Sequence, residues 1–83
     1  MKNTNDFLNI GLGSFANKDK ITCILSPEGS ASKRLKENAK KVNLLYDATQ
    51  GRKTRAIIVM DSGQIILSAI QVETLIGRAD TEM

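Results

Sequence analysis

Two apolar runs on either side of a turn signal constrain the fold of this 83-residue chain more than any other feature. The runs are Ile57-Ile-Val-Met60 and Ile65-Ile-Leu67, and Asp61-Ser-Gly63 lies between them. The glycine can take a positive φ, so the pattern predicts an antiparallel hairpin with strands at residues 55–60 and 64–69. Successive side chains of a strand point to opposite faces, and neither run alternates with polar residues. We therefore expect both faces of the hairpin to be apolar and covered.

Covering both faces is difficult for a chain of this length, which has room for one domain only. We expect that domain to span residues 1–83, with residues 1–6 flexible. One helix can cover one face of the hairpin, and little of the chain then remains for the other face. We therefore predict that the protein self-associates through this sheet or through its C-terminal helix. The alternative is that a short helix at residues 72–79 covers the second face within the same chain.

Three further strands are predicted, at residues 7–12, 20–25 and 44–46. The glycines of Gly11-Leu-Gly13 formally fit the start of a dinucleotide-binding motif, but that motif needs a helix directly after it. Here the polar stretch Asn17-Lys-Asp-Lys20 follows instead, and then another strand, so we expect these glycines to shape a turn. The predicted fold class is α+β: a small, mainly antiparallel sheet with a central hairpin and two helices, assembled as a homo-oligomer.

The first helix is expected to begin at Ser26-Pro-Glu28, where serine is a typical N-cap and proline suits the first helical position. Gly29 weakens this start and allows the helix to begin at Ser30 instead. Asn43 is expected to end the helix. Its buried stripe is predicted from apolar residues at spacings of four, four and three, namely Ala31, Leu35, Ala39 and Val42.

Several classes of site are excluded by what the chain lacks. It has one cysteine, Cys23, and no histidine, so an intrachain disulfide and the usual zinc-ligand sets cannot form. Cys23 lies in an apolar run and is expected to be a small buried hydrophobe. The acids are scattered and the commonest general base is missing, so we expect no enzyme activity, cofactor, metal site or small-molecule substrate. No apolar segment is long enough for a signal peptide or a membrane span, so we expect a cytoplasmic protein without membrane contact.

Positive charge is concentrated between Lys33 and Arg55, where there are eight basic residues and two acidic ones. Arg52, Lys53 and Arg55 come just after a glycine and before the apolar run at residues 56–60, so a buried strand is expected to carry a cationic loop. The planar guanidinium of arginine matches phosphate oxygens, and lysine acts as a mobile point charge. For the lysines of the first helix, a solvated surface is an equally good interpretation.

Lys18 and Lys20 lead into the strand at residues 20–25 and are expected to add to the same surface. Asp47 is expected to accept hydrogen bonds from amides of the loop that follows it. Aromatic residues, which would stack on unpaired bases, make up only 4% of the chain. The composition therefore favours contact with the backbone of duplex DNA over binding of single strands.

Six segments along the chain resemble, in the same order, the RemA-type bacterial regulators of extracellular-matrix genes. The similarity extends over roughly residues 7 to 76, nearly the whole chain. Its most specific part is the pattern Asp-Ala-Thr-x-Gly-Arg-x-Thr-Arg at residues 47–55. The segments are Asn9-Ile-Gly-Leu-Gly13, Ile24-Leu-Ser-Pro27, Asp47-Ala-Thr49, Gly51-Arg-Lys-Thr-Arg55, Ile58-Val-Met-Asp-Ser62 and Ile66-Leu-Ser-Ala69.

This resemblance implies a small DNA-binding transcriptional regulator that activates biofilm-matrix operons. It also implies ring-shaped homo-oligomers with basic residues around the outside, which engage the DNA backbone and bend or wrap the duplex. Three basic positions of the family contact DNA, and they fall on Lys20, Arg52 and Lys53 here. Two of these are lysines where the family usually has arginine, so charge is retained but bidentate phosphate recognition is lost. Gln50 also departs from the family, since relatives often carry an aromatic residue there.

The leading hypothesis is a cytoplasmic, homo-oligomeric regulator that binds double-stranded DNA through Lys20, Arg52 and Lys53, with Arg55 and Lys18 as helpers. The alternative from another class is a non-enzymatic scaffold or protein-interaction module whose basic loop docks an acidic partner. RNA binding is a third possibility.

Overall fold

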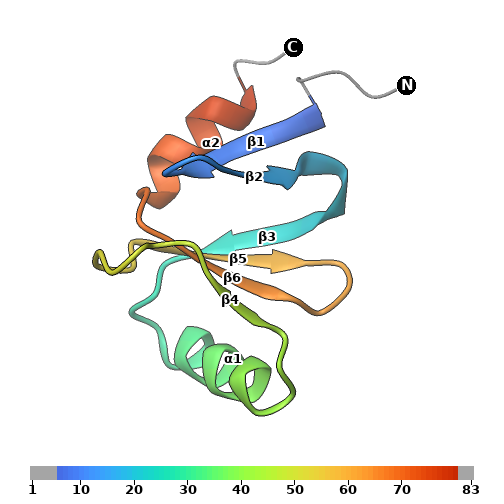
Figure 1. Cartoon of the computed structure of the whole chain (residues 1–83), viewed down its shortest axis with the longest axis vertical. Coiled ribbons are helices and arrows are strands. Elements are labelled where there is room, and N and C mark those ends of the chain that lie inside the picture. Colours follow the sequence, from blue (N-terminus) through green and yellow to red (C-terminus); the bar gives the residue numbers. More distant parts are fainter. Residues whose placement is uncertain (1–5, 81–83) are drawn as a thin grey trace.

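The computed structural model describes residues 6–80, which form two sheets and two α-helices (Figure 1). The predicted α+β fold class is therefore confirmed. Residues 1–6 were expected to be flexible, and all of them except Asp6 lie outside the described residues. The elements in chain order are β1 (Phe7–Gly11), β2 (Ser14–Asn17), the 3₁₀ turn η2 (Lys18–Lys20), β3 (Ile21–Leu25), α1 (Ser30–Lys41), β4 (Leu45–Asp47), β5 (Ala56–Met60), β6 (Ile65–Ser68) and α2 (Val72–Asp80).

The predicted hairpin is present as β5 and β6, which pair antiparallel with Ile57 opposite Leu67 and Ile58 opposite Ile66. Gly63 in its turn has a φ of 92°, the left-handed conformation expected there. The hairpin is the centre of a four-stranded sheet with the order β3-β5-β6-β4. β3 runs antiparallel to β5, whereas β4 runs parallel to β6. The parallel pair was not predicted, because parallel neighbours are not joined by a short turn and leave no local signal.

After β1 the chain turns back and forms a second strand, β2, so that the two strands make a two-stranded ribbon. β1 pairs antiparallel with β2, a strand that was not predicted. The segment Gly11-Leu-Gly13 forms the turn between them, as expected, and all three residues have positive φ. A Cβ on Gly11 would also lie only 2.8 Å from Cγ1 of Ile70, so glycine fits this position by conformation and by space.

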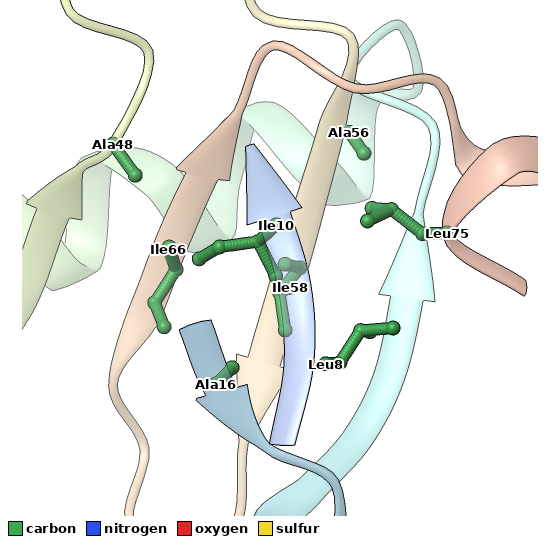
Figure 2. Packing of buried hydrophobic residues seen from close by; sticks show 8 residues of the cluster. All are labelled: Leu8, Ile10, Ala16, Ala48, Ala56, Ile58, Ile66 and Leu75. Carbon is green, nitrogen blue, oxygen red and sulfur yellow. The ribbon is translucent and has the colours of Figure 1, made fainter. Parts of the chain in front are cut away.

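One face of the central hairpin is covered by the ribbon and α2 (Figure 1). In Figure 2, Leu8 and Ile10 of β1 lie over Ile58 and Ile66 of the sheet, and Leu75 of α2 closes one side. The buried members of this first cluster are Leu8, Ile10, Ala16, Ala48, Ala56, Ile58, Ile66 and Leu75.

The opposite face of the hairpin is covered by α1, which lies on the other side of the sheet from α2 (Figure 1). Here Ile57, Ile65 and Leu67 pack with Ala39 in a second, smaller cluster. The expectation that little chain remains for the second face is therefore wrong, because the ribbon and α2 supply that cover. The alternative prediction of cover by the C-terminal helix is confirmed, although the helix shares the task with the ribbon. Self-association stays a prediction, but buried hairpin faces no longer argue for it.

α1 begins at Ser30 with Gly29 as its N-cap, so the start at Ser26 is wrong and the later start is confirmed. The Ser26 carbonyl instead accepts a hydrogen bond of 2.6 Å from the Ser32 hydroxyl, which ties the helix to the end of β3. Asn43, with a φ of 61°, follows the last turn as expected.

The predicted buried stripe of α1 is only partly correct. Ala39 is buried, but Ala31 is exposed, Leu35 is 36% exposed and Val42 is 63% exposed. Ser32 takes a buried place instead. The helix therefore contacts the sheet along a narrow strip and leaves most of its surface to solvent.

The expectation that Cys23 is buried is wrong, since its side chain is exposed. β3 is an edge strand, and Cys23 lies opposite Val59 of β5. α1 contacts mainly β4 and β6, at the far side of the sheet from β3, and so does not reach this position. An apolar run predicts a strand but does not tell whether the strand lies at the edge.

Candidate functional site

The cationic loop connects β4 to β5, and both of its ends are fixed to β6. The Ala48 N–H donates to the Leu67 carbonyl at 2.9 Å, and the Arg55 N–H donates to the Ser68 carbonyl at 2.8 Å. Ala48 is also buried in the first cluster. The loop therefore leaves the sheet and returns to it beside a single strand, which restricts its movement.

Asp47 fixes the first turn of this loop. Its Oδ1 accepts hydrogen bonds from the Thr49 N–H at 2.9 Å and from the Thr49 hydroxyl at 2.6 Å. These bonds, the hydroxyl bond foremost, hold the pKa of the Asp47 carboxyl below its usual value, and the charge of Lys36 acts in the same direction. The prediction that Asp47 bonds to an amide of the following loop is confirmed.

A tight turn places the cations. Gln50 and Gly51 have φ values of 52° and 84°, and the Arg52 N–H donates to the Thr49 carbonyl at 3.1 Å. Two successive positive φ values closed by such a bond characterise a type I′ turn. The Gln50 amide Nε2 also donates to the Leu12 carbonyl at 3.1 Å, which joins the loop to the β1–β2 turn.

Gly51→Ala is expected to lower the free energy of unfolding by about 1–2 kcal/mol, because an L side chain is disfavoured in the left-handed region. No atom lies within 4 Å of the added Cβ, so the cost comes from the backbone alone. Gly77→Ala in α2 is the matched control, because its Cβ also meets open space but helical backbone favours alanine. That change should raise the free energy of unfolding by about 0.5–1 kcal/mol. Urea unfolding measures both, and stabilisation by Gly51→Ala would contradict the turn geometry.

Arg52, Lys53 and Arg55 are exposed and lie together. They line a small hollow together with apolar residues from the β1–β2 turn and from the start of the connection to α2, namely Leu12, Ala69 and Ile70. The predicted cluster at residues 52–55 is therefore a continuous cationic surface on a fixed framework.

Lys33, in the first turn of α1, belongs to this surface although it was not among the predicted site residues. It lines a larger groove together with Lys53, Thr54 and Arg55. Glu28 and Glu73 also line this groove, so its wall carries both signs of charge. Only the packing of α1 beneath the loop could place Lys33 here, since it stands twenty positions before Lys53 in the chain.

Ser68 is a second residue that sequence patterns did not single out. Its carbonyl accepts from Arg55, and its buried hydroxyl donates to the Ile10 carbonyl at 2.8 Å and accepts from the Ile70 N–H at 3.0 Å. One side chain thus joins the sheet, the ribbon and the α2 connection directly behind the cationic loop.

Lys18 and Lys20 lie at the opposite end of the sheet from the loop. The Lys20 carbonyl accepts from the Asp61 N–H at 2.7 Å, beyond the end of β5, whereas Arg55 directly precedes β5. Six residues of extended chain separate the two ends, which is about 20 Å at roughly 3.3 Å per residue. In Figure 1 the loop lies to the left of the sheet, and η2 lies at the right, where β2 leads into β3. The expectation that these lysines add to the same surface therefore does not hold within one protomer.

Two further properties concern the part of the chain between residues 6 and 80. No three cysteine or acidic side chains there lie close enough together to hold a metal ion. Neither helix in that part is long and apolar enough to cross a membrane.

Fold and surface together define a small α+β protein that presents a cluster of cations on a fixed framework. The family model described as "RemA-like: Extracellular matrix regulatory protein A-like" matches residues 7–79. The chain belongs to the RemA-like family, which confirms the resemblance inferred from its motifs.

Similar proteins from several bacteria carry the description "Putative regulatory protein". One from Thermosipho melanesiensis is 55% identical over 71 residues, which cover 86% of this chain and 76% of the relative. One from Syntrophobacter fumaroxidans is 52% identical over 75 residues, covering 90% of this chain and 80% of the relative. One from Maridesulfovibrio salexigens is 51% identical over 75 residues, covering 90% and 87%. Family and relatives together indicate a regulatory role for this chain.

Proposed function

We propose that this protein is a cytoplasmic, homo-oligomeric transcription regulator that binds duplex DNA and activates extracellular-matrix genes. The observation that carries the proposal is the exposed cluster of Arg52, Lys53 and Arg55 on a loop fixed at both ends to β6. Membership of the RemA-like family supports the regulatory part and the connection to matrix genes.

Phosphate is the ligand that best suits these residues. Arginine can donate two parallel hydrogen bonds to one phosphate, and lysine supplies a mobile charge. Because the loop is already ordered by its type I′ turn and the bonds of Asp47, little backbone entropy is lost on binding. These cations contact the backbone and so position a duplex rather than read its bases.

Among the residues that the structure describes, no aromatic side chain lines the hollow that Arg52, Lys53 and Arg55 share. Phe15 and Tyr46 line a different hollow, with Ile10 and Gln64, from the one that Arg52 and Lys53 line. Single-stranded DNA is bound by stacking its bases on aromatic rings beside a cationic groove. The arrangement therefore favours the duplex.

Self-association completes the proposed function. Phe15, Tyr46 and Ile76 are exposed apolar side chains available for contact with further copies. In a ring the basic loop recurs at a constant interval, and each copy also contributes its Lys18 and Lys20 end. Repetition then raises the affinity of a site that binds weakly alone.

A salt titration with random duplex DNA tests this proposal. Three phosphate contacts per engaged subunit predict a slope of log K against log salt of about −2.7 for each subunit that touches the duplex. A scaffold that docks an acidic protein predicts no appreciable duplex binding at moderate salt, and that result would reject the proposal. Tighter binding of structured RNA than of the matched DNA would redirect it to RNA.

A further inference from the structure

α1 carries more positive charge than its place in the fold requires. Five of its twelve residues are basic and only Glu37 is acidic. The buried positions of the helix are Ser32 and Ala39, which fix how it is rotated against the sheet. At 3.6 residues per turn, the basic residues then divide into two groups.

The first group lies beside the buried face. Lys33, Lys36 and Lys40 follow a spacing of three and four and stand roughly 40–100° around the helix from Ser32. The second group, Arg34 and Lys41, stands roughly 160–180° from Ser32 and points away from the sheet. The first group is therefore a single row along one flank of α1, which we term the lysine row.

Two observations place the lysine row next to the cationic loop. Lys33 lines the same groove as Lys53 and Arg55. Lys36, one turn further along, is close enough to Asp47 for its charge to lower the pKa of that carboxyl. Asp47 is the last residue of β4 and directly precedes the loop. The row therefore begins beside the loop and continues away from it along the helix.

Acidic residues border the row but do not occupy a position in it. Glu28 and Glu73 line the groove beside Lys33, and Asp47 lies near Lys36. Glu37 stands about 40–60° further around the helix than Lys33 and Lys40. From Lys33 to Lys40 the row spans about 10.5 Å at 1.5 Å per residue. Along that length duplex DNA carries about six phosphate charges, one per roughly 1.7 Å of its axis.

We infer that Lys33, Lys36 and Lys40 form a second row of phosphate contacts, so that a duplex lies across both the cationic loop and the flank of α1. This inference rests on the proposed DNA-binding function and extends its site to a second element of the fold. Neighbouring cations on two rigid elements repel each other in the free protein, and a polyanion that spans both relieves this repulsion.

The test compares two double variants of the same helix that each remove two positive charges. Lys33→Gln with Lys40→Gln removes both ends of the lysine row, and Arg34→Gln with Lys41→Gln is the matched control. Glutamine has nearly the helix propensity of lysine and arginine, and all four positions are exposed, so both variants should fold. Circular dichroism verifies folding before binding is measured.

The row variant is expected to reduce the salt slope for a random duplex by about 1.8 per engaged subunit. Affinity falls as salt rises from 50 to 200 mM, and the factor by which it falls should be about 12 times smaller for the row variant than for the wild type. The control variant should keep the wild-type slope. If the wild-type protein binds the duplex, two results would overturn the inference alone. One is an equal reduction of the salt slope in both variants, and the other is a wild-type slope in the row variant. Absence of duplex binding by the wild type would overturn the proposed function and the inference together.

Discussion

Replacing Arg52 and Lys53 together by alanine is expected to abolish the shift of a DNA duplex in a gel while leaving the oligomer intact. Hydrogen bonds to charged groups contribute about 1.5–3 kcal/mol each, so two lost contacts cost about 3–6 kcal/mol per engaged subunit. The lower value already reduces affinity more than a hundredfold. The loop itself should persist, because the bond that closes its turn uses the backbone N–H of Arg52, which alanine retains.

Two measurements are needed to interpret this variant. Gel shift at moderate salt reports DNA binding, and analytical ultracentrifugation reports the oligomer. Arg34→Ala with Lys41→Ala is the matched control, since it removes the same charge from the outer face of α1 and should bind nearly as the wild type does. Normal binding by the Arg52 and Lys53 variant would show that the site is assigned wrongly. Simultaneous loss of the oligomer would show that the loop builds the assembly rather than the DNA contact.

Leu8→Ala is expected to lower the free energy of unfolding by about 2–5 kcal/mol. Leu8 is fully buried in the first cluster, where it lies over the sheet near Ile58 (Figure 2). Removing it leaves a cavity between the ribbon and the hairpin. Small domains are stable by only about 5–15 kcal/mol, so this one change should remove a large part of the total.

Leu35→Ala is the chemically identical control on α1. The Leu35 side chain is 36% exposed and lies outside both core clusters, so its truncation should cost about 1 kcal/mol or less. Urea unfolding at one fixed protein concentration measures both variants, because self-association would add to the apparent stability. If both variants lost the same free energy of unfolding, the ribbon would not be packed on the sheet as the structure shows.

The cationic loop was predictable because all its determinants are local. Arg52, Lys53 and Arg55 follow a turn glycine and precede a buried strand, and both features are visible in the ten consecutive residues 51–60. Asp47 was likewise assigned its role from its place before a turn, and its bonds to Thr49 confirm that. Lys33 and Ser68 were not predictable as parts of the site, since their partners come from distant segments.

The expected cover of the sheet illustrates the same limit. The unmixed apolar runs of β5 and β6 correctly predicted burial on both faces. What buries them depends in part on β2 (Ser14–Asn17), a four-residue strand that was not predicted because so short a segment has no clear strand signal. Self-association, which stays a prediction, now rests on exposed side chains such as Tyr46 and on the family.

By itself the sequence determined the hairpin, the α+β class, the basic loop and the family. Periodicity, turn residues and motifs depend only on residues that are close together in the chain. Tertiary structure alone decided which cations share a surface. Antiparallel pairing of β3 with β5 carries Lys18 and Lys20 to the end of the sheet remote from Arg52. Packing of α1 against β4 and β6 carries Lys33 toward Lys53 instead. Charge in a sequence has a total and an order, but its position in space follows from the direction and neighbours of the strands that carry it.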